Sequence, residues 1–204
     1  MISMEFLITA FIVVVMPGTG VIYTISTGLI QGPRAGVFAA TGCTAGIIPS
    51  LLACILGVAV IIHTSAMAFQ TLKFAGTAYL LYLAWSMWRQ TGTLELKTQQ
   101  KRKTMFRRAF KGFLINILNP KLTVFFLAFL PQFIPAGAPM PVLNMLVLGG
   151  VFMGMTWVVF IGYALLADKV RTWVVTSPAK VRHVQRTFAV LFAVLGAKLA
   201  FSGR

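Results

Sequence analysis

Hydrophobic residues run along this chain in long blocks, and polar residues are concentrated in the gaps between the blocks. Six blocks can be drawn: Phe6–Ile30, Val37–Ile62, Ala66–Trp88, Gly112–Ile134, Val142–Ala167 and Phe188–Phe201. Most of them reach the roughly 20 residues that a helix needs to cross a bilayer. The last block is short and carries Lys198, whose long side chain can reach the membrane interface. The pattern predicts an all-α integral membrane protein with six transmembrane helices.

Composition agrees with a membrane protein and excludes a soluble domain. Of the 204 residues, 58% are hydrophobic and 10% are charged, and the mean hydropathy is +0.88. A soluble domain carries about 25% charged residues and has too little interior for this much apolar surface. The first block has Glu5 in place of a positive leader and no small-residue cleavage site, so we expect a retained helix rather than a secretory signal.

The net charge of +15 is distributed unevenly between the gaps. Basic residues gather in three gaps, at 89–111, at 168–186 and at Arg34, whereas the gaps near 63–65 and 135–141 contain no Lys or Arg. Basic loops stay in the cytoplasm, so we expect a cytoplasmic basic loop at about 89–111 and both termini outside. Membrane lipids are the expected partners of these charges, and no nucleic acid is expected.

The chain divides into two halves of three spans within a single transmembrane transporter domain, 1–204. We place the first repeat at about 1–88 and the second at about 112–204. Three spans per half give the second half the opposite orientation. The first helix is broken at residues 16–20, Met-Pro-Gly-Thr-Gly, and the fourth at Asn119-Pro120. Breaks at corresponding positions of inverted repeats mark transporter binding sites, so the pattern predicts two inverted three-helix repeats with a site at the breaks.

The chemistry of the first break suits a small zwitterion. Pro17 has no N–H, so backbone carbonyls near Val13 and Val14 lose their partners and are free to face a cavity. Gly18 tolerates the irregular backbone. The N–H groups that begin the next half-helix favour an anionic group. A simple proline kink is the alternative for Pro17 alone, and the second break at Asn119-Pro120 favours a site instead.

Polar side chains accompany both breaks. Thr19 and Tyr23 share a face of the first helix, and Asn116 and Asn119 share a face of the fourth. Lys121 is a charged residue near the middle of a block, and it is expected to bind a substrate carboxylate, to carry a coupling proton or to extend to the interface. The candidate residues for substrate binding or translocation are Pro17, Gly18, Thr19, Tyr23, Asn116, Asn119, Pro120 and Lys121. Hydrogen bonding between helices is the alternative, and we prefer it for Thr44 and Ser50.

Enzyme chemistry is not expected. The chain has three acidic residues, two histidines and two cysteines, which is too few for a catalytic cluster, a metal site or a bound cofactor. Cys43 and Cys54 lie about 16 Å apart along one helix, too far for a disulfide with each other. The small-residue pairs Gly42/Gly46 and Gly150/Gly154 let helices approach closely, and they are compatible with packing inside one subunit or with a homodimer.

Three segments resemble the LysE/RhtB amino-acid exporters. The first is residues 16–18 with Gly32-Pro-Arg-Ala-Gly36 and Gly42, the second is 74–83, and the third is 110–121 continuing to Pro131-Gln-Phe133. The resemblance covers nearly the whole chain. One departure is Thr19, which stands where the family usually has a second proline.

The resemblance implies a secondary active exporter of amino acids or close derivatives in the bacterial cytoplasmic (inner) membrane, driven by the proton-motive force. From the residues alone, a passive channel or an efflux facilitator for other small metabolites stays open. Because no acidic residue lies within a block, a dibasic substrate is disfavoured, since its second positive charge would have no partner.

Overall fold

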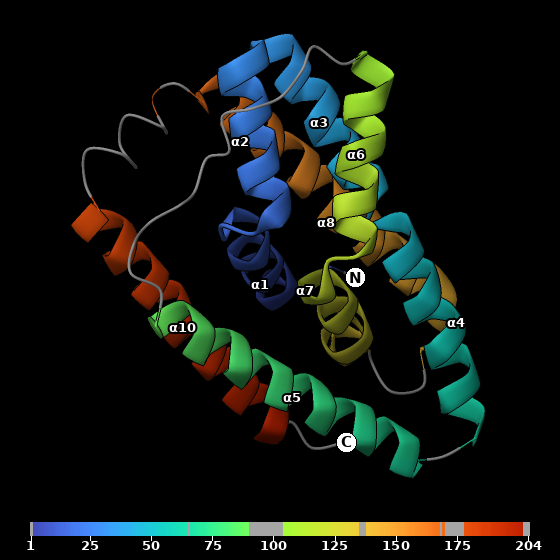
Figure 1. Cartoon of the computed structure of the whole chain (residues 1–204). Helices are drawn as coiled ribbons and strands as arrows, with labels where there is room; N and C mark the ends of the chain where they lie inside the picture. Colours follow the sequence, from blue (N-terminus) through green and yellow to red (C-terminus); the bar gives the residue numbers. More distant parts are fainter. Residues whose placement is uncertain are drawn as a thin grey trace.

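The computed structural model describes residues 2–64, 66–89, 104–134, 138–167, 169 and 178–201, and every regular element in these residues is helical (Figure 1). The elements are α1 (Met4–Val15), α2 (Thr19–Gln31), α3 (Pro33–Ala45), α4 (Ile48–Thr64), α5 (Ala66–Arg89), α6 (Met105–Ile117), α7 (Pro120–Val124), the π-helical turn η1 (Phe125–Phe129), the 3₁₀ turn η2 (Leu130–Phe133), α8 (Pro141–Leu165) and α10 (Pro178–Phe201). The predicted all-α membrane fold is confirmed.

The first span is broken where the sequence predicted. Helix α1 ends at Val15 and α2 begins at Thr19, and the two helix axes meet at 54°. Pro17 cannot donate a backbone hydrogen bond, and Gly18 is the extended residue that precedes α2. The local chemistry of two residues is therefore enough to divide the span.

The fourth span is broken in the same way. Helix α6 and the segment Pro120–Phe133 meet at 52°. The side chain of Asn119 accepts a hydrogen bond from the Lys121 N–H at 3.1 Å and caps α7, while Pro120 occupies the first helical position. Asn119 thus has a structural role in starting the second half of this span.

The fourth helix begins at Met105, so the predicted start at Gly112 is wrong. The hydroxyl of Thr104 caps the helix by accepting from the Arg107 N–H at 3.4 Å. The first two turns alternate basic residues with exposed aromatic ones, and the Phe106 and Phe110 rings stack with their centroids 6.4 Å apart. The apolar run in the sequence begins only after the last of these basic residues. An amphipathic helix at a membrane interface needs only one apolar face, so this helix begins earlier, among the charges. The rest of the predicted basic loop, 90–103, lies outside the described residues.

The second and fifth spans each begin with a proline in the first turn. The second runs from Pro33 through α3 into α4, which continues to Thr64, and the fifth is Pro141–Leu165. Helices α5 and α10 have 24 residues each. Each half therefore contains a bent pair of helices followed by two further helical stretches. The exact boundaries of the two repeats stay a prediction.

Helices α5 and α10 lie side by side, and α5 also packs against η1 (Figure 1). Helix α10 begins at Pro178, so the predicted start at Phe188 is wrong. Its early turns carry Arg182, His183 and Arg186, and the Arg186 guanidinium lies 5.1 Å from the centre of the Trp88 ring on α5. As in the fourth helix, the first turns contain charged residues, so the apolar run in the sequence begins later than the helix.

Not every predicted span is equally apolar. Among the described residues, three stretches are long and apolar enough to cross a membrane: Pro33–Gly57, Pro141–Leu165 and Arg182–Phe201. The two bent pairs bring the number to five. Helix α5 is long enough but is interrupted by Gln70 and Lys73, and it is the sixth predicted span by its length and its packing along α10.

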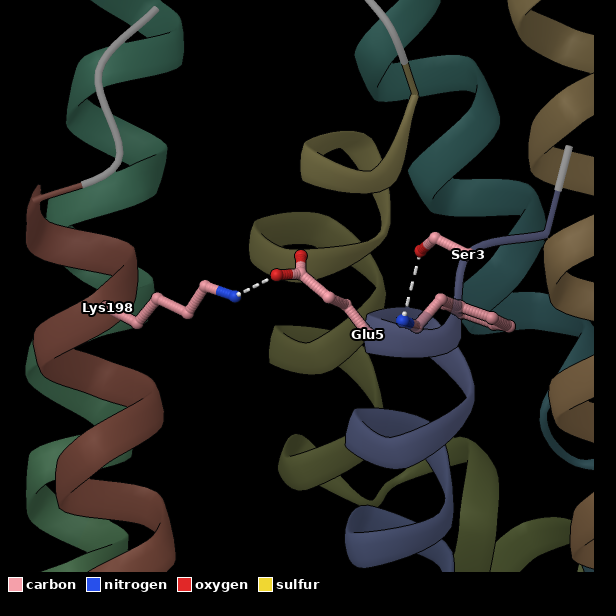
Figure 2. Close-up of polar contacts among 4 residues, drawn as sticks. Ser3, Glu5 and Lys198 are labelled. Carbon is pink, nitrogen blue, oxygen red and sulfur yellow. Dashed lines mark hydrogen bonds and ion pairs between the residues drawn. The ribbon is translucent and has the colours of Figure 1, made fainter.

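The start of α1 and the end of α10 meet at one end of the molecule. Figure 2 shows the Lys198 ammonium on α10 and the Glu5 carboxylate on α1 forming an ion pair with an N–O distance of 3.1 Å. The same view shows the Ser3 hydroxyl accepting from the Phe6 N–H at the start of α1. The first turn of α1 and the last turns of α10 are therefore in direct contact.

Candidate functional site

The two breaks lie against each other, and Lys121 joins them. From α7, its ammonium donates to the Val13 carbonyl at 3.1 Å and to the Met16 carbonyl at 3.5 Å. In an unbroken helix the Val13 carbonyl would accept from the N–H of residue 17, but residue 17 is proline. The lysine thus replaces the donor that Pro17 lacks. The prediction that carbonyls near Val13 are freed for other partners is confirmed.

A second side chain satisfies the same helix end. The hydroxyl of Tyr163, on α8, donates to the Val15 carbonyl at 2.8 Å. The carbonyls that the break releases are therefore bonded by groups from the second half of the chain. Such bonds hold the halves together at the break, and breaking them would release acceptor groups inside the protein.

The asparagines link the second break to α3. The Asn116 amide donates to the Cys43 carbonyl at 2.7 Å, and the Asn119 amide donates to the Asn116 side-chain oxygen at 3.4 Å. Asn116 is almost completely buried. A buried amide with satisfied partners holds its surroundings in one arrangement, so these residues set the position of the polar wall beside Lys121.

A cavity lies between the two breaks and α8. Its lining residues are Val13, Val14, Gly18, Gly20, Val21, Asn116, Asn119, Lys121, Leu122, Phe152, Thr156 and Phe160. The second break contributes the Lys121 ammonium and the two asparagine amides to the lining, and α8 contributes the Phe152 and Phe160 rings. The free volume is about 10 Å³, which is room for about one water molecule. A ligand of amino-acid size therefore requires the walls of the cavity to move apart.

Two glycines allow the breaks to come this close. A Cβ on Gly18 would lie 3.2 Å from the Lys121 Nζ, and a Cβ on Gly20 would lie 2.7 Å from the Asn116 Oδ1. The 2.7 Å contact at Gly20 is so short that the Asn116 side chain would have to shift. The absence of side chains at both positions therefore places backbone directly against the polar wall.

Four of the eight predicted site residues line the cavity, namely Gly18, Asn116, Asn119 and Lys121. Three others, Pro17, Thr19 and Pro120, belong to the breaks but are not among the lining residues. They shape the backbone around the cavity.

Tyr23 is directed elsewhere. Its hydroxyl donates to the Arg108 carbonyl at 2.9 Å, and the Lys111 ammonium lies 5.3 Å from the centre of its ring. The Arg108 guanidinium is itself buried and donates to the Gln31 side chain. Tyr23 thus belongs to a contact between the end of α2 and the start of α6, which Arg108 completes.

Sequence reasoning missed the contribution of α8, which supplies Phe152, Thr156, Phe160 and Tyr163. A signal existed in the sequence. Thr156 and Tyr163 are polar residues seven apart in an apolar span, and this spacing puts them on one helix face. Nothing in the sequence indicated that this face meets the first break.

Hydrogen bonding between helices was predicted for Thr44 and Ser50. The Ser50 and Thr123 hydroxyls lie 3.4 Å apart between α4 and α7, as predicted. For Thr44 the prediction is wrong, because its hydroxyl donates to the Ala40 carbonyl within α3. Cys43 and Cys54 are free and buried, and the Cys54 thiol donates to the Phe126 carbonyl in η1. No cluster of three or more possible metal ligands occurs in the part of the chain that the structure describes.

An all-helical membrane protein in which two broken spans, one from each half, line a common cavity has the architecture of many transporters. The chain matches the family described as LysE type translocator over residues 11–203, and it is a member of that family. The resemblance noted in the sequence is therefore confirmed.

Relatives of known name are exporters. The chain is 33% identical over 198 residues to a homoserine/homoserine lactone efflux protein of Salmonella typhimurium, covering 96% of this chain and 94% of the relative. It is 27% identical over 166 residues to a leucine efflux protein of an Enterobacter species, covering 77% of each chain. An uncharacterized membrane protein of Vibrio cholerae is 31% identical over 198 residues. No solved structure matches the chain.

Proposed function

We propose that this protein is a secondary active exporter of small neutral amino acids or close derivatives, with homoserine as the first candidate. The family match and the relatives named for homoserine, homoserine lactone and leucine efflux support this assignment. These compounds share an α-amino group and an uncharged side chain. A cavity lined by hydrogen-bonding groups and by aromatic rings suits that chemistry.

The observation that carries the proposal is the bridge from Lys121 to the carbonyls of Val13 and Met16. It joins the broken span of one half to the broken span of the other at the cavity. A carrier exposes one site alternately to the two sides of the membrane, and its site lies where the halves meet. A change in this bridge as substrate binds would couple occupancy of the cavity to the relative position of the halves.

We further propose that the protein lies in the inner membrane of a bacterium, with the basic loop in the cytoplasm and both termini outside. The positive-inside distribution of Lys and Arg supports this orientation. Export against a gradient needs an energy source. The proton-motive force is the proposed driver, on the basis of the family resemblance.

Export from living cells tests the function. Cells expressing the wild type, Lys121→Ala or the control Lys198→Ala at matched membrane levels would be fed a homoserine-containing dipeptide. Free homoserine inside and outside is then followed with time. We expect accumulation outside against the gradient with the wild type and the control, collapse when an uncoupler is added, and loss with Lys121→Ala.

Two results would contradict the proposal. If no tested amino acid accumulates outside although the protein is folded in the membrane, the amino-acid assignment is wrong. Flux that does not saturate and continues after uncoupling would instead identify a passive pore.

A further inference from the structure

The ammonium of Lys121 is bound by two backbone carbonyls that would accept hydrogen bonds from any primary ammonium group. The Val13 and Met16 carbonyls both accept from it at the end of α1, and Val13 and Lys121 both line the cavity. Carbonyl oxygens accept hydrogen bonds and carry partial negative charge at a helix C-terminus. Any primary ammonium that reached this point would find the same two partners.

We infer that Lys121 is an internal occupant of the subsite for the α-ammonium of the substrate, and that the substrate binds by exchange. The incoming ammonium takes the Val13 and Met16 carbonyls, and the incoming carboxylate takes the displaced lysine ammonium. This inference rests on the proposed function and adds to it the chemical groups by which a substrate is recognised.

The size of the cavity supports exchange over simple addition. Space for about one water molecule does not admit an amino acid beside the lysine in its present position. The lysine is also able to leave. Its ammonium is carried by a flexible four-carbon chain. Gly18 has no side chain to restrict the ammonium, whereas an added Cβ at that position would crowd it, at 3.2 Å from the Nζ.

Charge balance supports exchange as well. Before binding, one ammonium is held by the two carbonyls. After binding, one ammonium is held there and the lysine is paired with a carboxylate, so no charge is left buried without a partner. A ligand with an ammonium but no carboxylate would leave the displaced lysine unpaired. A ligand with a carboxylate but no ammonium would leave the carbonyls without a donor.

Three related probes separate these groups: homoserine, homoserine lactone, whose carboxylate is esterified, and N-acetylhomoserine, whose amine is blocked. Their binding to the purified full-length protein in lipid nanodiscs would be measured by calorimetry. For the wild type we expect homoserine to bind best and N-acetylhomoserine to bind at least about tenfold more weakly, since it cannot donate the charged hydrogen bonds.

The variant Lys121→Met should reverse the preference for a carboxylate. We expect it to lose at least about tenfold in affinity for homoserine, because the partner of the carboxylate is gone. Homoserine lactone should bind at least as tightly as to the wild type, because the carbonyls are free and no unpaired lysine results. Lys198→Met, which removes an exposed lysine from the ion pair with Glu5, should keep the wild-type order.

The possible outcomes distinguish failure of the exchange from failure of the proposed substrate class. Equal loss of homoserine and its lactone in a folded Lys121→Met protein, or N-acetylhomoserine binding as well as homoserine to the wild type, overturns the exchange and leaves the exporter assignment standing. If the folded wild type binds none of the probes, the proposed substrate class itself fails. Should Lys121→Met fail to fold, the wild-type preference for homoserine over both derivatives decides the inference.

Discussion

Pro17 shows how one residue creates the chemistry of this site. By lacking an N–H it leaves the Val13 carbonyl without its helical donor, and the structure supplies the Lys121 ammonium instead. Nearby, Tyr163 supplies a donor to Val15. At the scale of single residues, the site consists of backbone carbonyls that have lost their helical donors and of the side chains that donate to them instead.

Replacing Tyr163 by Phe tests the contribution of one such bond. The hydroxyl donates to the Val15 carbonyl at 2.8 Å, so its removal should destabilise the folded protein by about 1 kcal/mol. Thermal denaturation of the purified protein would show a lower midpoint. Tyr82→Phe, at a largely exposed position, is the control. Equal midpoints for the two variants would show that the Val15 contact contributes nothing.

The glycines at the first break should respond unequally to alanine. A Cβ at Gly18 would meet only the flexible end of Lys121, so Gly18→Ala should fold normally and lower transport. A Cβ at Gly20 would lie 2.7 Å from Asn116, whose amide is held by Cys43, and 3.1 Å from Phe160. Gly20→Ala should therefore also cost about 1–3 kcal/mol of stability. Export assays and thermal denaturation on both variants check this ranking, and a reversed order would refute it.

At the scale of elements, the two glycine pairs have different surroundings. Added Cβ atoms at Gly42 and Gly46 would collide with the backbone of Ala109 and Phe113, so the first pair brings α3 against α6 inside the subunit. An added Cβ at Gly150 or Gly154 would meet no heavy atom of another described segment within 4 Å. The predicted homodimer stays a prediction, and the open face of α8 is the part of the glycine pattern still compatible with it.

The different surroundings of the two glycine pairs predict different effects when one glycine of each pair is replaced by leucine. Gly42→Leu should separate α3 from α6 and lose about 3 kcal/mol or more, because backbone cannot yield as a flexible side chain does. Gly154→Leu should leave the folded subunit intact. The yield of monodisperse protein and its thermal midpoint measure both effects. A normal Gly42→Leu protein would show that close α3–α6 packing is not required.

For the molecule as a whole, the ion pair between Glu5 and Lys198 brings both ends of the described chain together. Figure 1 shows the corner between α2 and α3 at the opposite end of the bundle from the corner between α4 and α5. In the orientation that we propose from the positive-inside rule, the first corner faces the cytoplasm, and Glu5 and Arg34 lie on opposite sides of the membrane.

Cysteine labelling in intact cells tests this orientation. A membrane-impermeant thiol reagent should modify Glu5→Cys directly and Arg34→Cys only after the cells are permeabilised. The native Cys43 and Cys54 are buried, so the unmodified chain should stay unlabelled and serves as the control. Labelling of Arg34→Cys but not Glu5→Cys in intact cells would invert the proposed topology.

The extent of each helix was only partly predictable. The breaks predicted at residues 16–20 and at Asn119-Pro120 are present, the first confined to residues 16–18, because proline and its neighbours act within one helical turn. The starts of α6 and α10 were missed because their amphipathic turns contain charges that an apolar-run search rejects. Such turns are stabilised on one face only, so their extent depends on the neighbouring helices and the membrane interface.

The sequence by itself determined the membrane class, the two breaks and the polar residues beside them, because these follow from apolar length and from the missing N–H of proline. Only the tertiary structure decided which groups meet. Lys121 reaches Val13 across 108 positions of chain, and α8 contributes Phe152, Thr156 and Phe160 to the cavity lining. Tyr23 points toward Arg108 instead. Contacts between distant segments depend on how whole helices pack, and that packing is set by many weak interactions at once rather than by any local pattern.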